Sequence, residues 1–372
     1  MIGHAPAHSV SERIAIVAPS LDSVAILRHD LIKSLIRKGH RILCLTPPGP
    51  GRHVLTLRGL GAQHRVVDPP RARFRILDDW QEIAALVSQF NDWQPNVVLG
   101  YGLHTLTLAA VAARRAGVRR VVSLVNALPS DGVESVGRRR VAEAIRASDA
   151  VVFHNRDDRA TLTRLGLLPV NMDTLVVPGS GIDLKRFKAA PMPSCEDGFV
   201  FLMLGRLERR RGVLEYKAAA AHLKAQWPSA QFRFAGPPSR ASDAVAPETL
   251  TEGGAVEYLG DLEDVRPALT GCHVFVYPSY GEGMPRATLE ALATGRPVIT
   301  THAPGCADVV DEKVSGCLVP PADVKALIVA MESYLRNPEQ LAVGARAARL
   351  KAERRFDVKP VNAALARIIG VA

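Results

Sequence analysis

The sequence predicts an α/β protein made of two doubly wound domains. Short apolar runs of strand length alternate with helical patterns from one end of the chain to the other, which is typical of a parallel sheet covered by helices on both faces. The alternation stops once, in a stretch rich in proline and polar residues at 185–198, and then starts again. The length of 372 residues is about twice that of a typical single domain.

In the first half, apolar and β-branched runs predict buried strands. They lie at 13–18, 41–45, 96–99, 120–124 and 150–153. Helical periodicity marks 24–38, 106–116 and 156–166, and the glycines at 39, 117 and 166 suit the ends of these helices.

In the second half, strands are predicted at 199–204, 231–235, 273–277 and 297–300, and helices at 212–226, 322–336, 338–354 and 358–369. We therefore expect an N-terminal domain over 1–187, a C-terminal domain over 188–356 and a C-terminal helix over 357–372 that packs back on the first domain. Two such sheets facing one another would leave a central cleft at their carboxyl ends, where ligands bind in this architecture.

The composition favours a globular protein without a transmembrane helix or a disulfide framework. Hydrophobic residues make up 47% and charged residues 23%, which is ordinary for a globular protein. The sequence holds no apolar run long enough for a transmembrane helix, and 1–11 lacks an apolar signal core. The five cysteines are scattered without a C-x-x-C pair, so a disulfide framework is not expected and a cytoplasmic location is predicted.

The net charge of +10 is confined to one half of the chain. Residues 1–190 hold 26 Lys and Arg against 16 Asp and Glu, whereas the remainder holds 21 of each. Two basic clusters stand out, one of Arg65, Arg71, Arg73 and Arg75 and one of Arg138, Arg139 and Arg140. Such clusters attract anionic lipid surfaces or phosphorylated ligands, and the alternative interpretation is a solvated basic face.

The most specific motif runs from Gly281 to Ala291 and holds two glutamates eight residues apart, Glu282 and Glu290. A strand precedes it, and Pro285 suits the first turn of a helix. Glu282 is then placed on the loop and Glu290 inside the helix. The backbone amides near Gly283 and Met284 would face an anion at the helix N-terminus. The alternative is a capped core helix with an incidental glutamate.

This string, EGMPRATLE, resembles the E-x7-E signature of glycosyltransferase family 4, whose members have the two-domain GT-B fold. Gly205-Arg206-Leu207 with Arg211-Gly212 resembles the family's G-R-L-x-x-x-K-G, which supplies two cations to the donor diphosphate. Arg211 replaces the lysine, which keeps the charge but changes its geometry. Arg209 and Arg210 fit a solvated turn. The segments 234–237 and 256–260, with Gly236 and Leu259, resemble loops that frame the nucleotide base, and 304–310 and 316–321 complete the pattern.

The resemblance implies a retaining, metal-independent transferase without a cofactor, using a nucleotide diphosphate sugar, with a UDP-sugar favoured. Glu282, Arg206 and Arg211 are the implied catalytic residues. Gly205, Gly236, Leu259, Gly283, Met284, Pro285 and Glu290 are implied to bind the donor. The strings at 153–158, 177–183 and 285–286 resemble enzymes that extend polyprenyl-diphosphate-linked sugars. A lipid-linked saccharide acceptor and an anionic membrane surface are therefore the expected partners, on the inner face of the cell membrane.

Three residues of the first half complete the candidate site. The family often has a histidine after the strand at 120–124, where this chain has Asn126; asparagine donates hydrogen bonds but is no acid. His104 is a second candidate in the cleft, and a lone histidine is often structural. Arg28 either meets an acceptor phosphate or is a surface charge. Arg28 and the arginines at 71, 73, 75, 138, 139 and 140 form the candidate acceptor or membrane contacts.

Other classes of protein fit less well. The first loop lacks G-x-G-x-x-G, which weighs against a dinucleotide oxidoreductase, and no D-x-D or clustered metal ligands occur. A nucleic-acid binder would need interleaved aromatic residues, and the E-x7-E string disfavours an epimerase. A transferase acting on a soluble small acceptor and a non-catalytic nucleotide-sugar-binding relative stay open.

Overall fold

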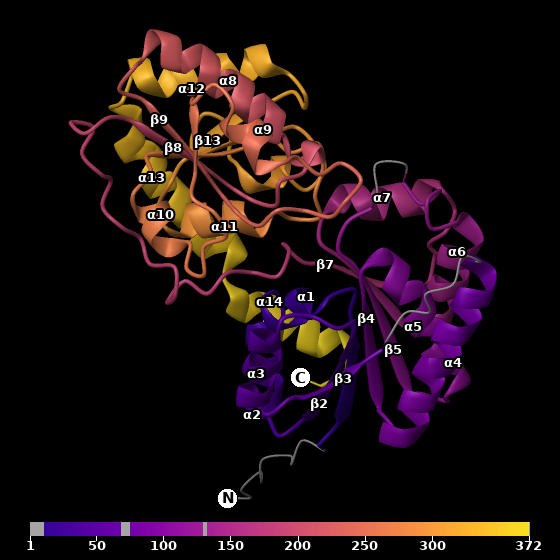
Figure 1. Ribbon diagram of the computed structural model, residues 1–372. Helices are drawn as coiled ribbons and strands as arrows, with labels where there is room; N and C mark the ends of the chain where they lie inside the picture. Colours follow the sequence, from indigo (N-terminus) through magenta and orange to yellow (C-terminus); the bar gives the residue numbers. More distant parts are fainter. Residues whose placement is uncertain (1–10, 68–74, 129–131, 372) are drawn as a thin grey trace, which may run out of the picture. The chain divides into compact units, whose positions relative to one another are not determined.

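The computed structural model describes residues 11–67, 75–128 and 132–371 (Figure 1). The chain forms two compact units: unit 1 comprises Met1–Ser180 and Lys359–Ala372, and unit 2 comprises Gly181–Val358. The sequence placed the change of domain at 187–188, whereas the chain passes between the units at 180–181. Most of the final helix, α14 (Val358–Ile368), belongs to unit 1.

Within the described residues, unit 1 holds a seven-stranded parallel sheet in the order β3-β2-β1-β4-β5-β6-β7. Its strands are β1 (Arg13–Val17), β2 (Arg41–Thr46), β3 (Gln63–Val66), β4 (Val97–Tyr101), β5 (Arg120–Val125), β6 (Ala150–Phe153) and β7 (Asp173–Val176). Its other helices are α1 (Leu21–Ala25), α2 (His29–Arg37), α3 (Gly51–Leu60), α4 (Arg75–Trp93), α5 (Leu103–Arg115), α6 (Arg138–Ala147) and α7 (Arg156–Arg164).

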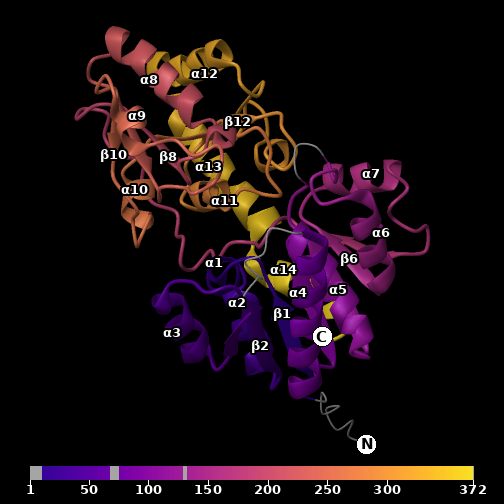
Figure 2. The same ribbon diagram turned by 45° about the vertical axis from the view of Figure 1, so that its right-hand side comes forward.

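The sheet of unit 1 is buried on both faces because successive side chains of a strand point to opposite sides. Ile14 and Ile16 of β1 join a core with α2, α3 and α14. Ala15 and Val17 join a second core with α4, α5 and α6. The two helical layers are visible on either side of the strands (Figures 1 and 2).

Unit 2 holds a six-stranded parallel sheet within the described part of the chain, in the order β10-β9-β8-β11-β12-β13. Its strands are β8 (Val200–Leu204), β9 (Gln231–Ala235), β10 (Val256–Tyr258), β11 (Val274–Tyr277), β12 (Val298–Thr301) and β13 (Gly316–Val319). The helices are α8 (Val213–Gln226), α9 (Pro247–Thr251), α10 (Arg266–Thr270), α11 (Arg286–Ala293), α12 (Val324–Arg336) and α13 (Gln340–Lys351). The short 3₁₀ helices η1 (Arg209–Arg211) and η2 (Ala307–Val309) and the π-helix η3 (Ala352–Phe356) belong to the same unit. Helices α8, α9 and α12 cover one face, and α11 and α13 cover the other.

Two parts of the predicted element pattern need correction. The single helix expected at 24–38 is two helices, α1 and α2, and Arg28 between them has the non-helical dihedrals φ −115° and ψ 8°. This break lets the Arg28 side chain turn into the protein, as described below. The segment 256–260 is not only a loop, because it begins with the short strand β10. The segment 316–321, for which no element was predicted, begins with the strand β13.

The stretch that the sequence marked as a linker is held on unit 2 by a buried arginine. Arg296 is fully buried, and its guanidinium donates to the carbonyls of Ala190 and Pro191 at 3.1 and 2.8 Å. It also donates to the carbonyls of Leu269 and Thr270 at 3.0 and 2.8 Å. These bonds fasten a segment without regular structure to α10. The segment with a linker-like composition is therefore part of folded unit 2.

Candidate active site

The sheet of unit 2 reverses its strand order between β8 and β11. The helix after β8 covers one face and the helix after β11 covers the other, so the loops diverge and leave room at the carboxyl ends of these strands. The residues that the sequence assigned to donor binding lie on these two loops, at the ends of β9 and β10, and in α11. The motif residues of unit 2 therefore meet at one edge of the sheet.

Two glycines let backbone pack directly on backbone at this edge. A Cβ at Gly236 would lie 1.8 Å from the carbonyl oxygen of Gly205. Gly305 has φ +72°, and a Cβ there would lie 2.0 Å from the carbonyl oxygen of Glu282. The amide of Glu282 donates to the carbonyl of Pro304 at 3.0 Å. The position of Glu282 thus depends on a neighbour that has no side chain.

Arg211 is the centre of a polar cluster. Its Nη1 donates to the hydroxyl of Tyr277 and to Oε1 of Glu282, and its Nε donates to Oε2 of Glu208 at 3.0 Å. The Tyr277 hydroxyl donates to the same Glu282 oxygen at 3.0 Å. The structure therefore joins two residues that the sequence proposed separately, Arg211 and Glu282, in one ion pair.

Glu290 lies inside α11, where the sequence placed it, and Glu282 lies on the preceding loop. The Glu290 carboxylate accepts a hydrogen bond at 2.9 Å from Nε of Arg286, which lies one helical turn earlier. Burial raises the pKa of Glu290, and the charge of Arg286 opposes this rise. Met284 and Pro285 precede the first turn, where the helix dipole favours an anion.

The ends of β9 and β10 are joined by hydrogen bonds near Gly236. The Leu259 amide donates to the carbonyl of Phe234, and the Tyr258 hydroxyl donates to the carbonyl of Gly236, both at 2.8 Å. Arg206 follows Gly205 directly, and its side chain is exposed. This edge therefore offers the exposed Arg206 and the half-buried Arg211 together with the carboxylates of Glu208, Glu282 and Glu290.

Asn126 and His104 belong to unit 1, at the carboxyl edge of its own sheet. Asn126 follows β5 and is partly buried, while His104 lies in the first turn of α5 and is exposed. Gly102, between β4 and α5, has φ +86°, and a Cβ there would lie 3.1 Å from Pro19 and 3.7 Å from the Asn126 side chain. The loops after β1, β4 and β5 thus converge.

Arg28 is not a surface charge, because only 1% of it is exposed. Its Nη2 lies 2.8 Å from Nε2 of His154, and its guanidinium lies 4.8 Å from the centroid of the Tyr101 ring. Burial and the charge of Arg28 lower the pKa of His154 well below its usual value. This lowered pKa favours the neutral ring, whose Nε2 can accept from Arg28, and a hydrogen bond with the backbone of Asn126 opposes the shift.

A buried carboxyl lies close by, at the start of α7. Asn155 caps this helix by accepting from the Asp158 amide at 2.8 Å. One oxygen of Asp158 accepts from the Asn155 side chain at 2.9 Å and from the Leu128 amide at 3.2 Å. Burial raises the pKa of Asp158 to about 6, in spite of these hydrogen bonds.

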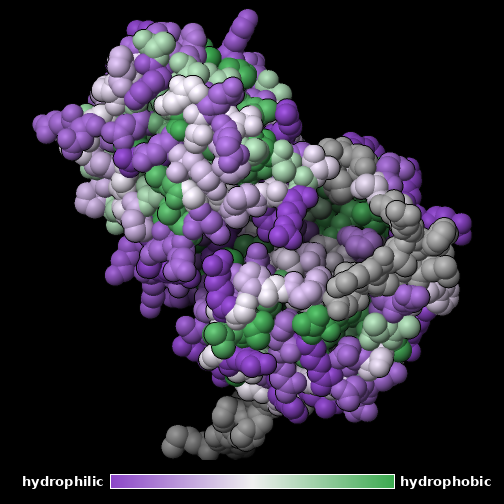
Figure 3. All heavy atoms as spheres, viewed as in Figure 1, coloured by the Kyte–Doolittle hydropathy of each residue, from purple (hydrophilic) through white to green (hydrophobic). Residues whose placement is uncertain are grey.

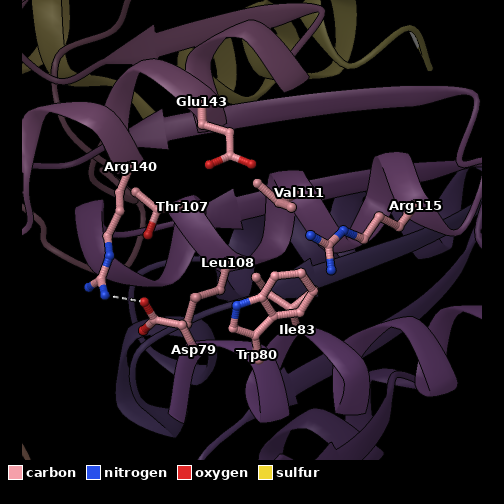
Figure 4. A pocket seen from close by; sticks show the side chains of 9 residues that line it. All are labelled: Asp79, Trp80, Ile83, Thr107, Leu108, Val111, Arg115, Arg140 and Glu143. Carbon is pink, nitrogen blue, oxygen red and sulfur yellow. Dashed lines mark ion pairs between the residues drawn. The ribbon is translucent and has the colours of Figure 1, made fainter. Parts of the chain in front are cut away.

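The arginines proposed for acceptor or membrane contact differ in their surroundings. Arg71 and Arg73 lie outside the described residues, and Arg75 begins α4. Arg140 pairs with Asp79 in a hollow of about 250 Å³ between α4, α5 and α6, where Arg115 lies 4.6 Å from the centroid of the Trp80 ring (Figure 4). Arg138 donates to the Leu165 carbonyl at 3.0 Å, and Arg139 is exposed.

Sequence reasoning missed three residues of these clusters. Tyr277 was seen only as the end of a strand, Glu208 only as part of an arginine-rich turn, and His154 only as part of a family string. A signal existed for Tyr277, because the last residue of a parallel strand lies at the edge where ligands bind. Nothing in the sequence links Glu208 to Arg211 in particular.

Within residues 11–67, 75–128 and 132–371, no three His, Cys, Asp or Glu side chains come together as a candidate metal site. In the same residues, no helix combines the length and the apolar character needed to cross a membrane. On the face shown in Figure 3, hydrophobic residues occur in small groups among hydrophilic ones.

Two family models match the chain. The model described as Glycosyltransferase Family 4 matches residues 24–186, and the model described as Glycosyl transferases group 1 matches residues 198–337. The fold agrees with solved structures. The structure of Anabaena Alr3699/HepE in complex with UDP and glucose has a TM-score of 0.78 at 18% identity and covers 97% of this chain and 100% of its own. The class is thus defined: the chain is a glycosyltransferase with the GT-B fold, as predicted.

More particularly, the chain belongs to the glycosyltransferases that combine a family 4 domain with a group 1 domain. A Campylobacter jejuni relative, N,N'-diacetylbacillosaminyl-diphospho-undecaprenol alpha-1,3-N-acetylgalactosaminyltransferase, is 24% identical, over 82% of this chain and 84% of its own. An Escherichia coli relative, UDP-Gal:alpha-D-GlcNAc-diphosphoundecaprenol alpha-1,3-galactosyltransferase, is 26% identical, over 69% of this chain and 70% of its own.

Replacing Asp158 by asparagine should stabilise the protein in a pH-dependent way. The folded-state pKa of about 6 exceeds the ordinary value of 3.8, so the carboxyl favours folding below pH ~4 and loses that contribution as the pH rises through 6. An amide carries no charge, so Asp158→Asn should raise the free energy of unfolding by about 2–3 kcal/mol at pH 7.5 and by little at pH 4.

Thermal and urea unfolding across pH 4–8 measure this effect. Asp157→Asn is the matched control, because Asp157 is the exposed neighbour on the same helix. A gain for Asp158→Asn that is the same at both ends of the pH range contradicts the assignment of a buried carboxyl.

Proposed function

We propose that this glycosyltransferase transfers a sugar, with retention at the anomeric carbon and without a metal ion, from a nucleotide diphosphate sugar to a polyprenyl-diphosphate-linked saccharide. The observation that carries the proposal is the pairing of Arg211 with Glu282 at the strand-order reversal of unit 2, one loop away from Glu290. A diphosphate needs cations, and a sugar and a ribose need hydrogen-bond acceptors. This edge holds both kinds of group.

Each side chain has a distinct role in this proposal. Arg206, Arg211 and the amides before α11 stabilise the negative charge that develops on the leaving diphosphate. Glu282 accepts a hydrogen bond from a sugar hydroxyl, and Glu290 accepts from the ribose. The departing phosphate oxygen takes the proton of the acceptor hydroxyl on the same face of the sugar. Asn126 and His104 are candidates on the acceptor side.

The charge of Arg211 explains how the site stays ordered without donor. The guanidinium and the Glu282 carboxylate neutralise one another in the structure. The donor diphosphate then competes with Glu282 for Arg211, and the Glu282 carboxylate accepts from the sugar. Arg211 thus exchanges one partner for another while its own position is kept, which costs little reorganisation.

The names of the relatives support the nature of the acceptor. Both the Campylobacter and the E. coli protein are named for transfer to sugars carried on diphospho-undecaprenol, and both form alpha-1,3 linkages by name. The E. coli protein is named for UDP-Gal, and the Anabaena structure contains UDP. A UDP-sugar is accordingly the proposed donor, and an alpha linkage from an alpha-linked nucleotide sugar is retention.

Nucleotide release from a panel of UDP- and GDP-sugars, with and without a polyprenyl-diphosphate-linked saccharide, tests the proposed reaction. Release that depends on the lipid-linked acceptor is expected, and it should survive exhaustive chelation with EDTA because arginines meet the diphosphate charge. Release that a soluble sugar stimulates equally well contradicts the acceptor. Loss in EDTA with recovery on adding magnesium or manganese contradicts the metal-independent mechanism.

The two glutamates should separate in their effects. Glu290→Gln should weaken UDP binding about 5- to 10-fold, because the ribose hydroxyl would then donate to a neutral amide oxygen in place of a carboxylate. Glu282→Gln should leave UDP affinity within a few-fold of the wild type and lower turnover more strongly. Calorimetry with UDP and steady-state kinetics give the two readouts. The control is Glu332→Gln, because Glu332 also forms an i,i+4 ion pair, with Arg336 on α12, although the glutamate comes first in that pair. Wild-type UDP affinity in Glu290→Gln rules out the ribose role.

We also propose that unit 1 contacts anionic membranes reversibly, which would bring a lipid-linked acceptor within reach. The charge excess of residues 1–190 supports this proposal, and so does the exposure of Trp80, 59%, beside the stacked Arg115. Amphipathic aromatic rings favour the membrane interface, and each basic residue near an anionic surface contributes about 1 kcal/mol.

Co-sedimentation with phosphatidylserine vesicles measures this contact. Binding should be present at low salt and fall steeply as the screening length drops to about 10 Å at 0.1 M. Serine at 71, 73, 75, 138, 139 and 140 should abolish it, whereas serine at the unit 2 arginines 266 and 336 should not. Absence of binding at low salt refutes the membrane contact.

A further inference from the structure

Glu208 is a buried carboxylate in the turn between β8 and η1. It occupies an unspecified position of the G-R-L-x-x-x-K-G motif, so the motif assigns it no role. Only 1% of it is exposed. Its Oε2 accepts from Nε and Nη2 of Arg210 at 3.0 and 2.8 Å and from Nε of Arg211 at 3.0 Å. Its Oε1 accepts from the Ser239 hydroxyl at 2.8 Å.

The carboxylate of Glu208 is charged and fixed in place. Burial opposes its ionisation, but the hydrogen bonds from Ser239 and Arg210 and the charge of Arg211 outweigh burial and lower its pKa. The backbone holds it as well, since its amide donates to the Arg206 carbonyl at 2.8 Å and its carbonyl accepts from the Arg211 amide at 3.1 Å. A buried charge with four hydrogen bonds is a rigid partner.

The two carboxylates that contact Arg211 differ in exposure. The Glu208 side chain is 1% exposed, whereas that of Glu282 is 21% exposed. Under the proposed function, Glu282 leaves Arg211 when the donor binds, and Glu208 is the carboxylate that stays. Without it, the guanidinium would lose its second anchor at the moment when it has to hold a diphosphate.

The planar guanidinium makes this anchor directional. Glu208 contacts Nε, and Tyr277 and Glu282 contact Nη1. Two points fix the plane and therefore the direction of the third nitrogen, Nη2, which makes no hydrogen bond to any residue that the structure describes. A lysine at 211 has no atom equivalent to Nε, so a carboxylate at 208 matches an arginine in particular.

We propose that Glu208 is the positioning residue of Arg211: it holds the guanidinium so that Nη2 meets the donor diphosphate after Glu282 has turned to the sugar. This inference rests on the proposed function. The competing explanation is a purely local role, in which Glu208 ties Arg210 and the turn together and acts on the site only through general stability.

A double-mutant cycle on UDP affinity separates the two explanations. Glu208→Gln should weaken UDP binding about tenfold or more in the wild-type background, the loss expected when a charged hydrogen bond no longer orients its partner. In an Arg211→Met background, the same substitution should change UDP affinity less than about twofold. Equal losses in both backgrounds overturn the positioning role.

Two further variants test whether Glu208 acts through Arg211 rather than through Arg210 or through a failure to fold. Arg210→Ala leaves Arg211 intact and should keep UDP affinity within about twofold; a loss as large as that of Glu208→Gln would mean that Glu208 acts through Arg210. If Glu208→Gln does not fold, Glu208→Asp keeps the charge but withdraws the carboxylate by one methylene. It should weaken UDP binding in the wild-type background and not in Arg211→Met, and equal losses overturn the proposal.

Failure of the proposed donor site and failure of the positioning role of Glu208 give different results. If the wild type binds neither UDP nor GDP in calorimetry, the proposed donor site fails, and the inference fails with it. If the wild type binds UDP and Arg211→Met weakens that binding, but Glu208→Gln has equal effects in both backgrounds, only the positioning role fails.

Discussion

Both sheets of this protein are parallel and covered by helices on both faces, so the central strands offer little room for charged chemistry along their length. Every residue of β8 is buried, and β1 is buried from Ile14 onward. In these two strands charged groups are therefore absent or confined to the first residue, whereas Arg233 and Glu257 pair with one another within β9 and β10. In unit 2, the reversal of strand order between β8 and β11 opens one of these ends. That constraint brings Arg211 and Glu282, far apart in sequence, into one ion pair.

Arginine is used in two opposite electrostatic settings. Arg211 lies between carboxylates of unequal burial, so one partner can be exchanged while the other stays. Arg28 in unit 1 lies beside a neutral His154 and the face of Tyr101. There burial, aided by the guanidinium charge, lowers the pKa of His154, and a hydrogen bond with the backbone of Asn126 acts against this shift. An arginine thus holds polar side chains together at the carboxyl edge of each sheet, Arg28 in unit 1 and Arg211 in unit 2.

Irregular segments are fixed by side chains that bind backbone. Arg296 donates to the carbonyls of Ala190, Pro191, Leu269 and Thr270. Arg349 donates to the carbonyls of Phe187 and Ala293 at 2.8 and 2.6 Å. Buried carbonyls without partners are costly, so these arginines allow a stretch without helix or strand to belong to unit 2.

The strand and helix alternation and the loop position of Glu282 could be predicted from the sequence alone, because periodicity and helix-start residues act over a few neighbours. The family could be predicted as well, because its motif is a continuous string. The break before Arg28, the chain crossing at 180–181, the pairing of Arg140 with Asp79 and the anchor at Glu208 could not be. Each depends on a partner from another segment, and a guanidinium in a sequence does not reveal which carboxylate, ring or carbonyl will meet it. Only packing brings such partners together.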